Sequence, residues 1–161
     1  VRHDPNAMPT AAKGVGMYVN SSLAKVEALK AGYDEAVLLA GDGQVSECTG
    51  ENLFVIRGGV IYTPHSSDAG ALEGITQNSV MTIASDLGYE VRQGTILRTD
   101  LYLADEAFLT GTAAEVTPIR ELDRVEIGSG SRGPITEKIQ NGFFDIVNGR
   151  NPQYANWLSA V

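Results

Sequence analysis

The chain has 161 residues, enough for one domain with a hydrophobic core. Its 20 acidic and 12 basic residues give a net charge of −8, which argues against nucleic acid or an anionic membrane surface as a partner. No apolar run approaches the roughly 20 residues of a membrane span, and no signal peptide is visible. The single cysteine, Cys48, favours a reducing cytoplasm. His3 and His65 have no companions at ligand spacing, so we expect no metal site.

The first residues, VRHDPNAMPTAAK, read as an extended connection without an initiator Met. Asp4-Pro5 and Met8-Pro9 favour extended backbone, because the residue before a proline is biased away from the helical region. We therefore expect residues 1–9 to be a linker. Lys13 follows among small residues and, taken alone, is most simply a surface lysine.

The spacing of Val19, Leu23 and Val26 predicts a helix over residues 19–31, which Gly32 ends. The next segment, residues 36–63, reads as a meander of strands. Asp42-Gly43 stands between the apolar runs AVLLA and QVSEC, and this dipeptide predicts a hairpin because both of its turn positions need φ > 0.

The second arm of that hairpin carries Glu47 among small residues. Two interpretations are open: a sheet-edge carboxylate that faces water, or a buried carboxylate that meets a cation, since Glu is rarely buried unless paired. Cys48 is next along the strand and points to the opposite face, where we expect a small, inert core residue.

Residues 64–76 read as a loop that leads into a helix over residues 76–87. Val80, Ile83, Ala84 and Leu87 share one face of this helix and should point inward. The sequence Gly74-Ile75-Thr76 leads into this helix. Free N–H groups and the helix dipole make this start a candidate anion site, with an ordinary threonine cap as the alternative.

The remainder predicts a strand at 89–93, a short helix at 99–104 and a strand at 106–109 that runs into GTAAEVTPIR. The G-x-G-x-x-G pattern at 128–133 lacks a parallel βαβ context and is interpreted as a loop. A helix should cover 134–147 with Ile135, Ile139, Phe143 and Ile146 inward, and Trp157 and Leu158 should dock on the domain. Hairpins dominate, so we predict an α+β fold: an antiparallel, barrel-like sheet flanked by helices.

The order E-C-T-G-E-N-L-F, then I-Y-T, then L-E-G-I-T-Q resembles the signature of the class IV pyridoxal-phosphate aminotransferases. TAAKGVGMY and LTGTAAEVTPIR fall where the branched-chain amino-acid aminotransferases carry their other cofactor-side motifs. One departure is Gln77, where the family signature has Lys or Arg. The resemblance implies the pseudo-barrel large domain of fold type IV, over residues 10–161, with an N-terminal small domain outside this chain.

The resemblance also implies roles for individual residues. Lys13 would form the Schiff base with pyridoxal 5′-phosphate and act as the catalytic base and acid. Glu47 would pair with the pyridine nitrogen, Tyr18 would reach the 3′-oxygen, and Leu72 would pack against the ring. The phosphate would lie at Ile75, Thr76 and Thr112, and the N–H groups of Thr112 and Ala113 would face the substrate carboxylate.

The function implied is transfer of the amino group of leucine, isoleucine or valine to 2-oxoglutarate. The implied partners are amino and 2-oxo acids, the N-terminal domain of the same protein, and further copies in a homo-oligomer. D-amino-acid aminotransferase and aminodeoxychorismate lyase remain alternatives within the family. A hypothesis of another class is an inactive C-terminal fragment that only binds cofactor or an anion.

Overall fold

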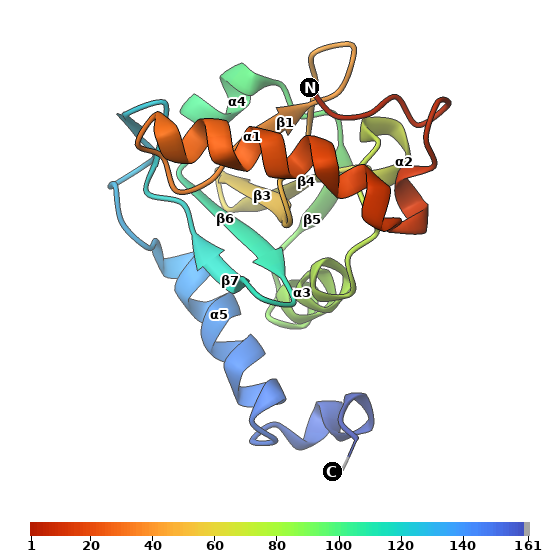
Figure 1. The fold of residues 1–161 in the computed structure, drawn as a ribbon. Helices are drawn as coiled ribbons and strands as arrows, with labels where there is room; N and C mark the ends of the chain where they lie inside the picture. Colours follow the sequence, from red (N-terminus) through yellow and green to blue (C-terminus); the bar gives the residue numbers. More distant parts are fainter. Residues whose placement is uncertain (160–161) are drawn as a thin grey trace.

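The computed structural model describes residues 1–159 of an α+β protein, as the sequence predicts (Figure 1). Its main sheet has five strands in the order β5-β4-β3-β6-β7. All neighbouring pairs are antiparallel except β4 and β5, which are parallel because residues 65–90 cross over between them. The strands are β3 (Asn52–Arg57), β4 (Val60–Pro64), β5 (Val91–Gly94), β6 (Glu106–Gly111) and β7 (Glu115–Pro118).

The predicted Asp42-Gly43 hairpin is confirmed, and it joins β1 (Val37–Leu39) to β2 (Val45–Cys48). The expected turn type is wrong. Gly43 has φ 89°, but Asp42 is not among the residues with positive φ. The loop is longer than two residues: the Gly43 N–H donates to the Ala40 carbonyl at 3.0 Å, and the Ala40 N–H to the Gln44 carbonyl at 2.8 Å. A register shift between Leu38 and Leu39 absorbs the extra length.

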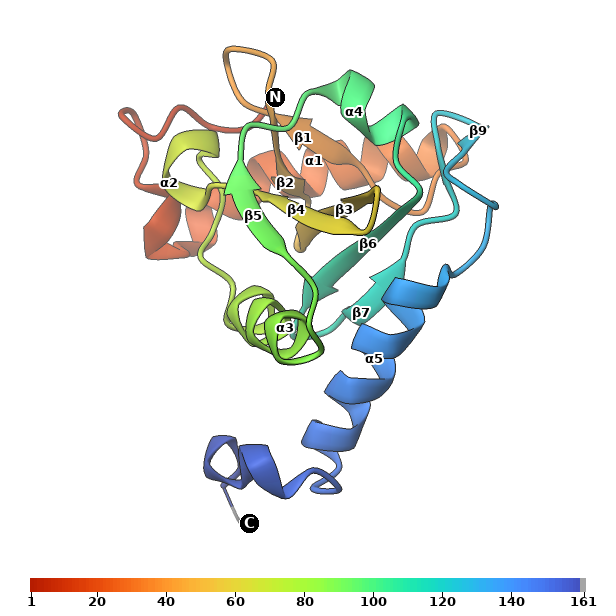
Figure 2. The same ribbon diagram turned by 180° about the vertical axis from the view of Figure 1, so that it is seen from behind.

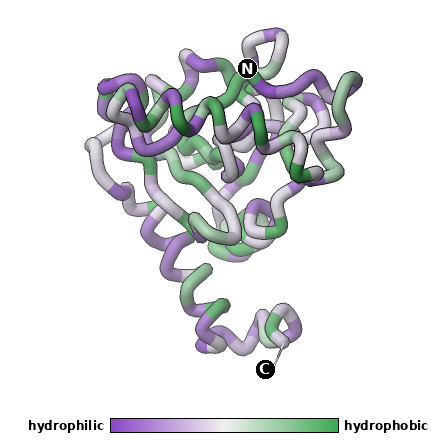
Figure 3. The backbone as a smooth tube through the Cα atoms, viewed as in Figure 1, coloured by the Kyte–Doolittle hydropathy of each residue, from purple (hydrophilic) through white to green (hydrophobic). Residues whose placement is uncertain are grey.

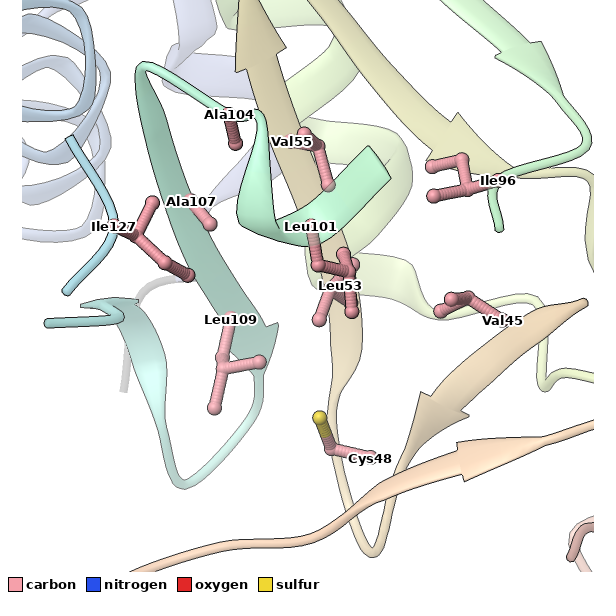
Figure 4. Packing of buried hydrophobic residues seen from close by; sticks show 10 residues of the cluster. All are labelled: Val45, Cys48, Leu53, Val55, Ile96, Leu101, Ala104, Ala107, Leu109 and Ile127. Atoms are coloured by element: carbon pink, nitrogen blue, oxygen red, sulfur yellow. The ribbon is translucent and has the colours of Figure 1, made fainter. Parts of the chain in front are cut away.

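The two-stranded sheet of β1 and β2 and the five-stranded main sheet curl around a common apolar core. The Val45 N–H donates to the Ile96 carbonyl at 2.7 Å, so the segment after β5 lies against β2. Figure 4 shows the core that this curl encloses, with Cys48 among its aliphatic side chains. This connection of β5 to β2 gives the barrel-like arrangement expected. The core comprises Val45, Cys48, Leu53, Val55, Ile96, Leu101, Ala104, Ala107, Leu109 and Ile127.

A second core lies on the other side of the main sheet, under α3 (Ile75–Asp86) and α5 (Pro134–Val147). Phe54 and Phe108 stack at its centre with their rings 4.8 Å apart. The views from both sides show these two helices next to each other at the same end of the sheet (Figures 1 and 2). The predicted inward faces are confirmed except for Leu87, which is 47% exposed because α3 has already ended at Asp86.

The short elements are α2 (Ser66–Ala69), inside the predicted loop, α4 (Arg98–Tyr102), β8 (Glu121–Leu122), β9 (Val125–Glu126) and the 3₁₀ helices η1 (Thr10–Ala12), η2 (Val15–Met17) and η3 (Pro152–Trp157). Residues 128–133 form a loop before α5, as expected. Within residues 1–159 no helix has the length and apolarity needed to cross a membrane.

The predicted docking of the C-terminal residues is wrong in its choice of residues. Trp157 and Leu158 are 41% and 40% exposed, whereas Tyr154 is buried. The Tyr154 hydroxyl donates to the Asp86 carboxylate at the end of α3, and its ring packs with Ile83 and Ile146. A tyrosine suits this buried place because its ring packs while its hydroxyl finds an acceptor.

The predicted first helix is α1 (Tyr18–Lys30), and its apolar stripe faces outward. Val19, Leu23 and Val26 are 63%, 67% and 47% exposed, while Ser21 is buried. Figure 3 shows the resulting hydrophobic segments along α1. The spacing therefore predicted a helix correctly, but the apolar face does not pack on this domain.

Candidate active site

Four of the predicted cofactor residues meet in one cleft. Lys13, Tyr18, Glu47 and Leu72 line it, although they come from three separate parts of the chain. Its other lining residues are Arg2, Thr10, Met17, Thr49, Gly50, Glu51 and Asn52. The cleft thus combines a primary amine, a phenol and a buried carboxylate.

Lys13 ends η1 in the left-handed conformation, with φ 50° and ψ 40°. This backbone geometry is uncommon for a residue with a side chain. Lys13 is exposed, and a Cβ built on the next residue, Gly14, would meet no atom within 4 Å. The backbone at Gly14 is therefore uncrowded, and Lys13 itself is accessible from the cleft. Tyr18 begins α1 and is 37% exposed at the edge of the cleft.

Glu47 is buried and paired, which rules out the interpretation of a water-facing carboxylate. Its Oε1 lies 2.7 Å from Arg2 Nη2, and its Oε2 accepts the Leu72 N–H at 2.8 Å. Burial raises the pKa of the Glu47 carboxyl, while the Leu72 N–H and the charges of Arg2 and Lys13 oppose this rise. The carboxylate is therefore fixed in position at the bottom of the cleft.

Arg2 is a site residue that sequence reasoning missed, because it lies within the predicted linker. It is buried, its Nε donates to the Gly70 carbonyl at 3.0 Å, and its backbone N–H donates to the Leu39 carbonyl at 2.7 Å. The one available signal was indirect: a buried Glu47 needs a cation, and composition gives no indication of which one.

The predicted anion position lies at the N-terminus of α3. Gly74 is its N-cap, and no partner for the Ile75 or Thr76 N–H occurs in the part of the chain that the structure describes. At α5, by contrast, two N–H groups of the first turn, those of Ile135 and Thr136, are taken by the Glu106 carboxylate, at 3.0 and 2.7 Å. The start of α3 is therefore open to a ligand from outside.

Gln77 is buried beneath the start of α3. Its amide donates to Thr63 Oγ1 at 3.0 Å and accepts the Gly74 N–H at 3.4 Å. The residue that departs from the family signature therefore supports the core and the helix cap and adds no charge near the anion position.

Ile75, Thr76, Thr112 and Ala113 are outside the set of residues that line the cleft. Thr112 and Ala113 are exposed in the turn between β6 and β7. This turn is connected to the cleft through Gly111, where a Cβ would lie 3.4 Å from the Gly50 carbonyl oxygen. The structure thus places Lys13 and Glu47 in the same cleft, and it places the β6–β7 turn beside the edge of that cleft.

The sequence profile described as amino-transferase class IV matches residues 1–122. The chain belongs to the class IV aminotransferase family. It is 49% identical to the branched-chain-amino-acid aminotransferase of Pseudomonas aeruginosa over 160 residues, and 50% identical to the probable branched-chain-amino-acid aminotransferase of Aquifex aeolicus over 161 residues. In both cases the match covers 99% of this chain, but 52% and 51% of the relative.

Solved structures of the family share the fold. The branched-chain amino acid aminotransferase from Thermobaculum terrenum, in its PLP form, superposes with a TM-score of 0.96 at 42% identity, over 99% of this chain and 52% of that one. The Escherichia coli enzyme gives a TM-score of 0.95 at 44% identity, over 99% of this chain and 53% of that one. This class IV aminotransferase chain thus has the type IV fold and spans about half the length of the curated relatives it matches.

Proposed function

We propose that the full protein is a pyridoxal-phosphate-dependent aminotransferase that moves the amino group of leucine, isoleucine or valine to 2-oxoglutarate. One observation carries the proposal: the exposed amine of Lys13 and the buried carboxylate of Glu47 line the same cleft. An amine at one end and a fixed anion at the other suit an aldehyde-bearing pyridine ring between them. The names of the relatives favour the branched-chain substrates.

The donor set of this class IV chain fits the cofactor. When bound, pyridoxal phosphate supplies an aldehyde for the amine and a ring that withdraws electrons from the substrate α-carbon. Lys13 would hold the group covalently and would move a proton at that carbon. Glu47 would keep the ring nitrogen protonated, and Tyr18 would donate to the 3′-oxygen. Leu72 would pack on the ring face.

The phosphate and the substrate carboxylate need different residues. The N–H groups of Ile75 and Thr76, which have no partner within residues 1–159, would hold the phosphate together with the Thr76 and Thr112 hydroxyls. The N–H groups of Thr112 and Ala113 would orient the substrate carboxylate. The full protein would act as a homo-oligomer in a reducing cytoplasm, where the buried thiol of Cys48 stays free.

The first test is covalent trapping in the full protein. Pyridoxal phosphate followed by borohydride should raise the intact mass by one reduced adduct, and peptide mapping should place it on Lys13. Lys13→Ala should abolish both the adduct and transamination. Lys25→Ala is the matched control, because Lys25 is already held by Glu35 at 2.7 Å and should not react. An adduct that persists in Lys13→Ala would contradict the assignment.

The second test separates the functions that share this fold. Amino-group transfer from L-leucine, L-isoleucine and L-valine to 2-oxoglutarate should exceed transfer from D-alanine, and no pyruvate should be released from aminodeoxychorismate. Preference for the D-amino acid or the lyase substrate would replace the proposed substrate class. An adduct without turnover of any substrate would favour a cofactor-binding scaffold.

A further inference from the structure

The peptide groups of Leu72 are held from both sides. Its N–H donates to Glu47 Oε2 at 2.8 Å, and its carbonyl accepts from Asn52 Nδ2, also at 2.8 Å. Asn52 is only 6% exposed and comes from the start of β3, whereas Glu47 comes from β2. A loop residue outside regular structure is thus fixed by two buried side chains.

Asn52 makes a second contact two residues further along the same loop. A Cβ at Gly74 would lie 2.0 Å from Asn52 Oδ1, too close for any real pair of atoms. Gly74 has φ −75° and ψ 133°, which any residue can adopt. The absence of a side chain at position 74 is therefore required by the position of the Asn52 amide and not by the backbone conformation.

These contacts connect the two ends of the candidate site. Glu47 lies at one end, and Gly74 caps the helix whose free N–H groups form the other. Residues 72–74 join the two ends, and Asn52 contacts the first and last of them. Its amide also lies 3.5 Å from Glu47 Oε2, so one side chain reaches the carboxylate, the loop and the helix start.

We propose that Asn52 is a positioning residue that sets the separation between the Glu47 carboxylate and the start of α3. The inference rests on the proposed function for the identity of the ligand. The pyridine ring is rigid and its phosphate is attached through a short arm, so the distance from the ring nitrogen to the phosphate is limited. A shift of the loop would therefore satisfy one end of the ligand at the expense of the other. Without the Asn52 amide, the Leu72 carbonyl loses its donor and the loop can move.

The test is a double-mutant cycle in the full protein, with pyridoxal phosphate affinity measured by fluorescence titration and melting temperature measured without cofactor. Asn52→Ala should weaken binding about tenfold, as expected for the loss of a buried hydrogen-bond donor. Gly74→Ala should weaken it at least as much, because the new methyl displaces the amide. The double variant should be no weaker than Gly74→Ala, since Asn52→Ala removes the atoms that the methyl meets.

Two further variants distinguish a positioning role of Asn52 from a general loss of packing around the site. Thr110→Val is the matched control: Thr110 is paired with Asn52 across β3 and β6, is fully buried, and its hydroxyl has no partner within the described residues. Its affinity should equal that of the wild type. Asn52→Asp keeps the size but loses the donor at neutral pH, so its affinity relative to wild type should recover as acid restores a donating carboxylic acid.

The inference would be overturned if Asn52→Ala bound pyridoxal phosphate as tightly as the wild type. It would also be overturned if the losses of binding free energy in the two single variants simply added in the double variant. An affinity of Asn52→Asp for pyridoxal phosphate, relative to wild type, that does not change with pH would also overturn it. If the wild type itself fails to bind pyridoxal phosphate, the proposed function is wrong. The melting-temperature cycle needs no cofactor and would then decide whether Asn52 and Gly74 are coupled.

Discussion

Replacing Arg2 by methionine should destabilise the domain through Glu47. Methionine fills a similar length without charge, so the change leaves a buried carboxylate that keeps only the Leu72 N–H, 2.8 Å away, and the weaker Asn52 amide contact at 3.5 Å. The two partners of the lost ion pair are 2.7 Å apart, with side chains 7% and 9% exposed. Removal of one member of such a buried pair costs about 3–5 kcal/mol.

For a domain of this size, about 1 kcal/mol corresponds to roughly 2–4 °C in melting temperature. Arg2→Met should therefore melt roughly 6–20 °C below the wild type at pH 7, a range that follows from the same two estimates. Arg2→Met combined with Glu47→Gln should recover the part of the loss that comes from the unpaired charge, because the neutral amide still accepts the Leu72 N–H and no charge remains buried. The Gly70 carbonyl still lacks the Arg2 donor in both variants.

The pH dependence gives an independent check. The pKa of Glu47 is already raised by burial, and loss of Arg2 removes one of the charges that oppose this rise. A carboxyl with a raised pKa in the folded state contributes stability that is present at low pH and is lost as pH rises through that pKa. The gap between Arg2→Met and wild type should thus be small in acid and grow toward neutral pH.

Thermal melts of the cofactor-free protein by circular dichroism between pH 4 and 8 would measure both effects. A melting temperature within about 2 °C of wild type at pH 7, less than 1 kcal/mol on the same scale, would refute the reasoning. A gap that stays constant over this pH range would also refute it, because the loss would then arise from packing and not from the charge of Glu47.

Three other predictions follow from the site and the C-terminal contact. Glu47→Gln should keep the cofactor but slow the half-reaction with leucine by roughly 10²-fold, which stopped-flow spectroscopy would measure; a near wild-type rate would contradict its role. The same variant should melt below the wild type, because it leaves Arg2 buried without its charge partner. Thr76→Ala should weaken binding of the cofactor phosphate a few-fold, about 1 kcal/mol in calorimetry, while Ser79→Ala on the same helix should not. The pKa of Tyr154 is raised to about 12 by burial and by Asp86, so stability should fall between about pH 10 and 12 in wild type but not in Tyr154→Phe.

Most elements were predictable because their patterns are local. Asp42-Gly43 marked a hairpin, and the spacing of Val80, Ile83 and Ala84 marked the inward face of α3. The residues of the site were assigned by motif, and the structure places Lys13 and Glu47 in one cleft. Their chemical roles stay predictions until the trapping and kinetic experiments are done.

The predictions from sequence that were incomplete or wrong concern contacts between residues that are far apart in the chain. Arg2 lies in a segment with the composition of a linker, and only the folded structure shows that it pairs with Glu47. The stripe that includes Leu23 has the spacing of an inward face but points outward, because periodicity identifies an apolar face without stating what covers it. Trp157 is the larger aromatic of the tail, yet Tyr154 is the one within reach of Asp86.

At position 13 the left-handed backbone lowers the stability of the fold, whereas the proposed chemistry requires the amine of a lysine there. A residue with a Cβ at φ 50° and ψ 40° costs about 1 kcal/mol relative to glycine. Lys13→Gly should therefore melt a few degrees higher while it loses the reactive amine. Under the proposed function, the residue at position 13 is kept for its amine, although the backbone conformation there favours glycine.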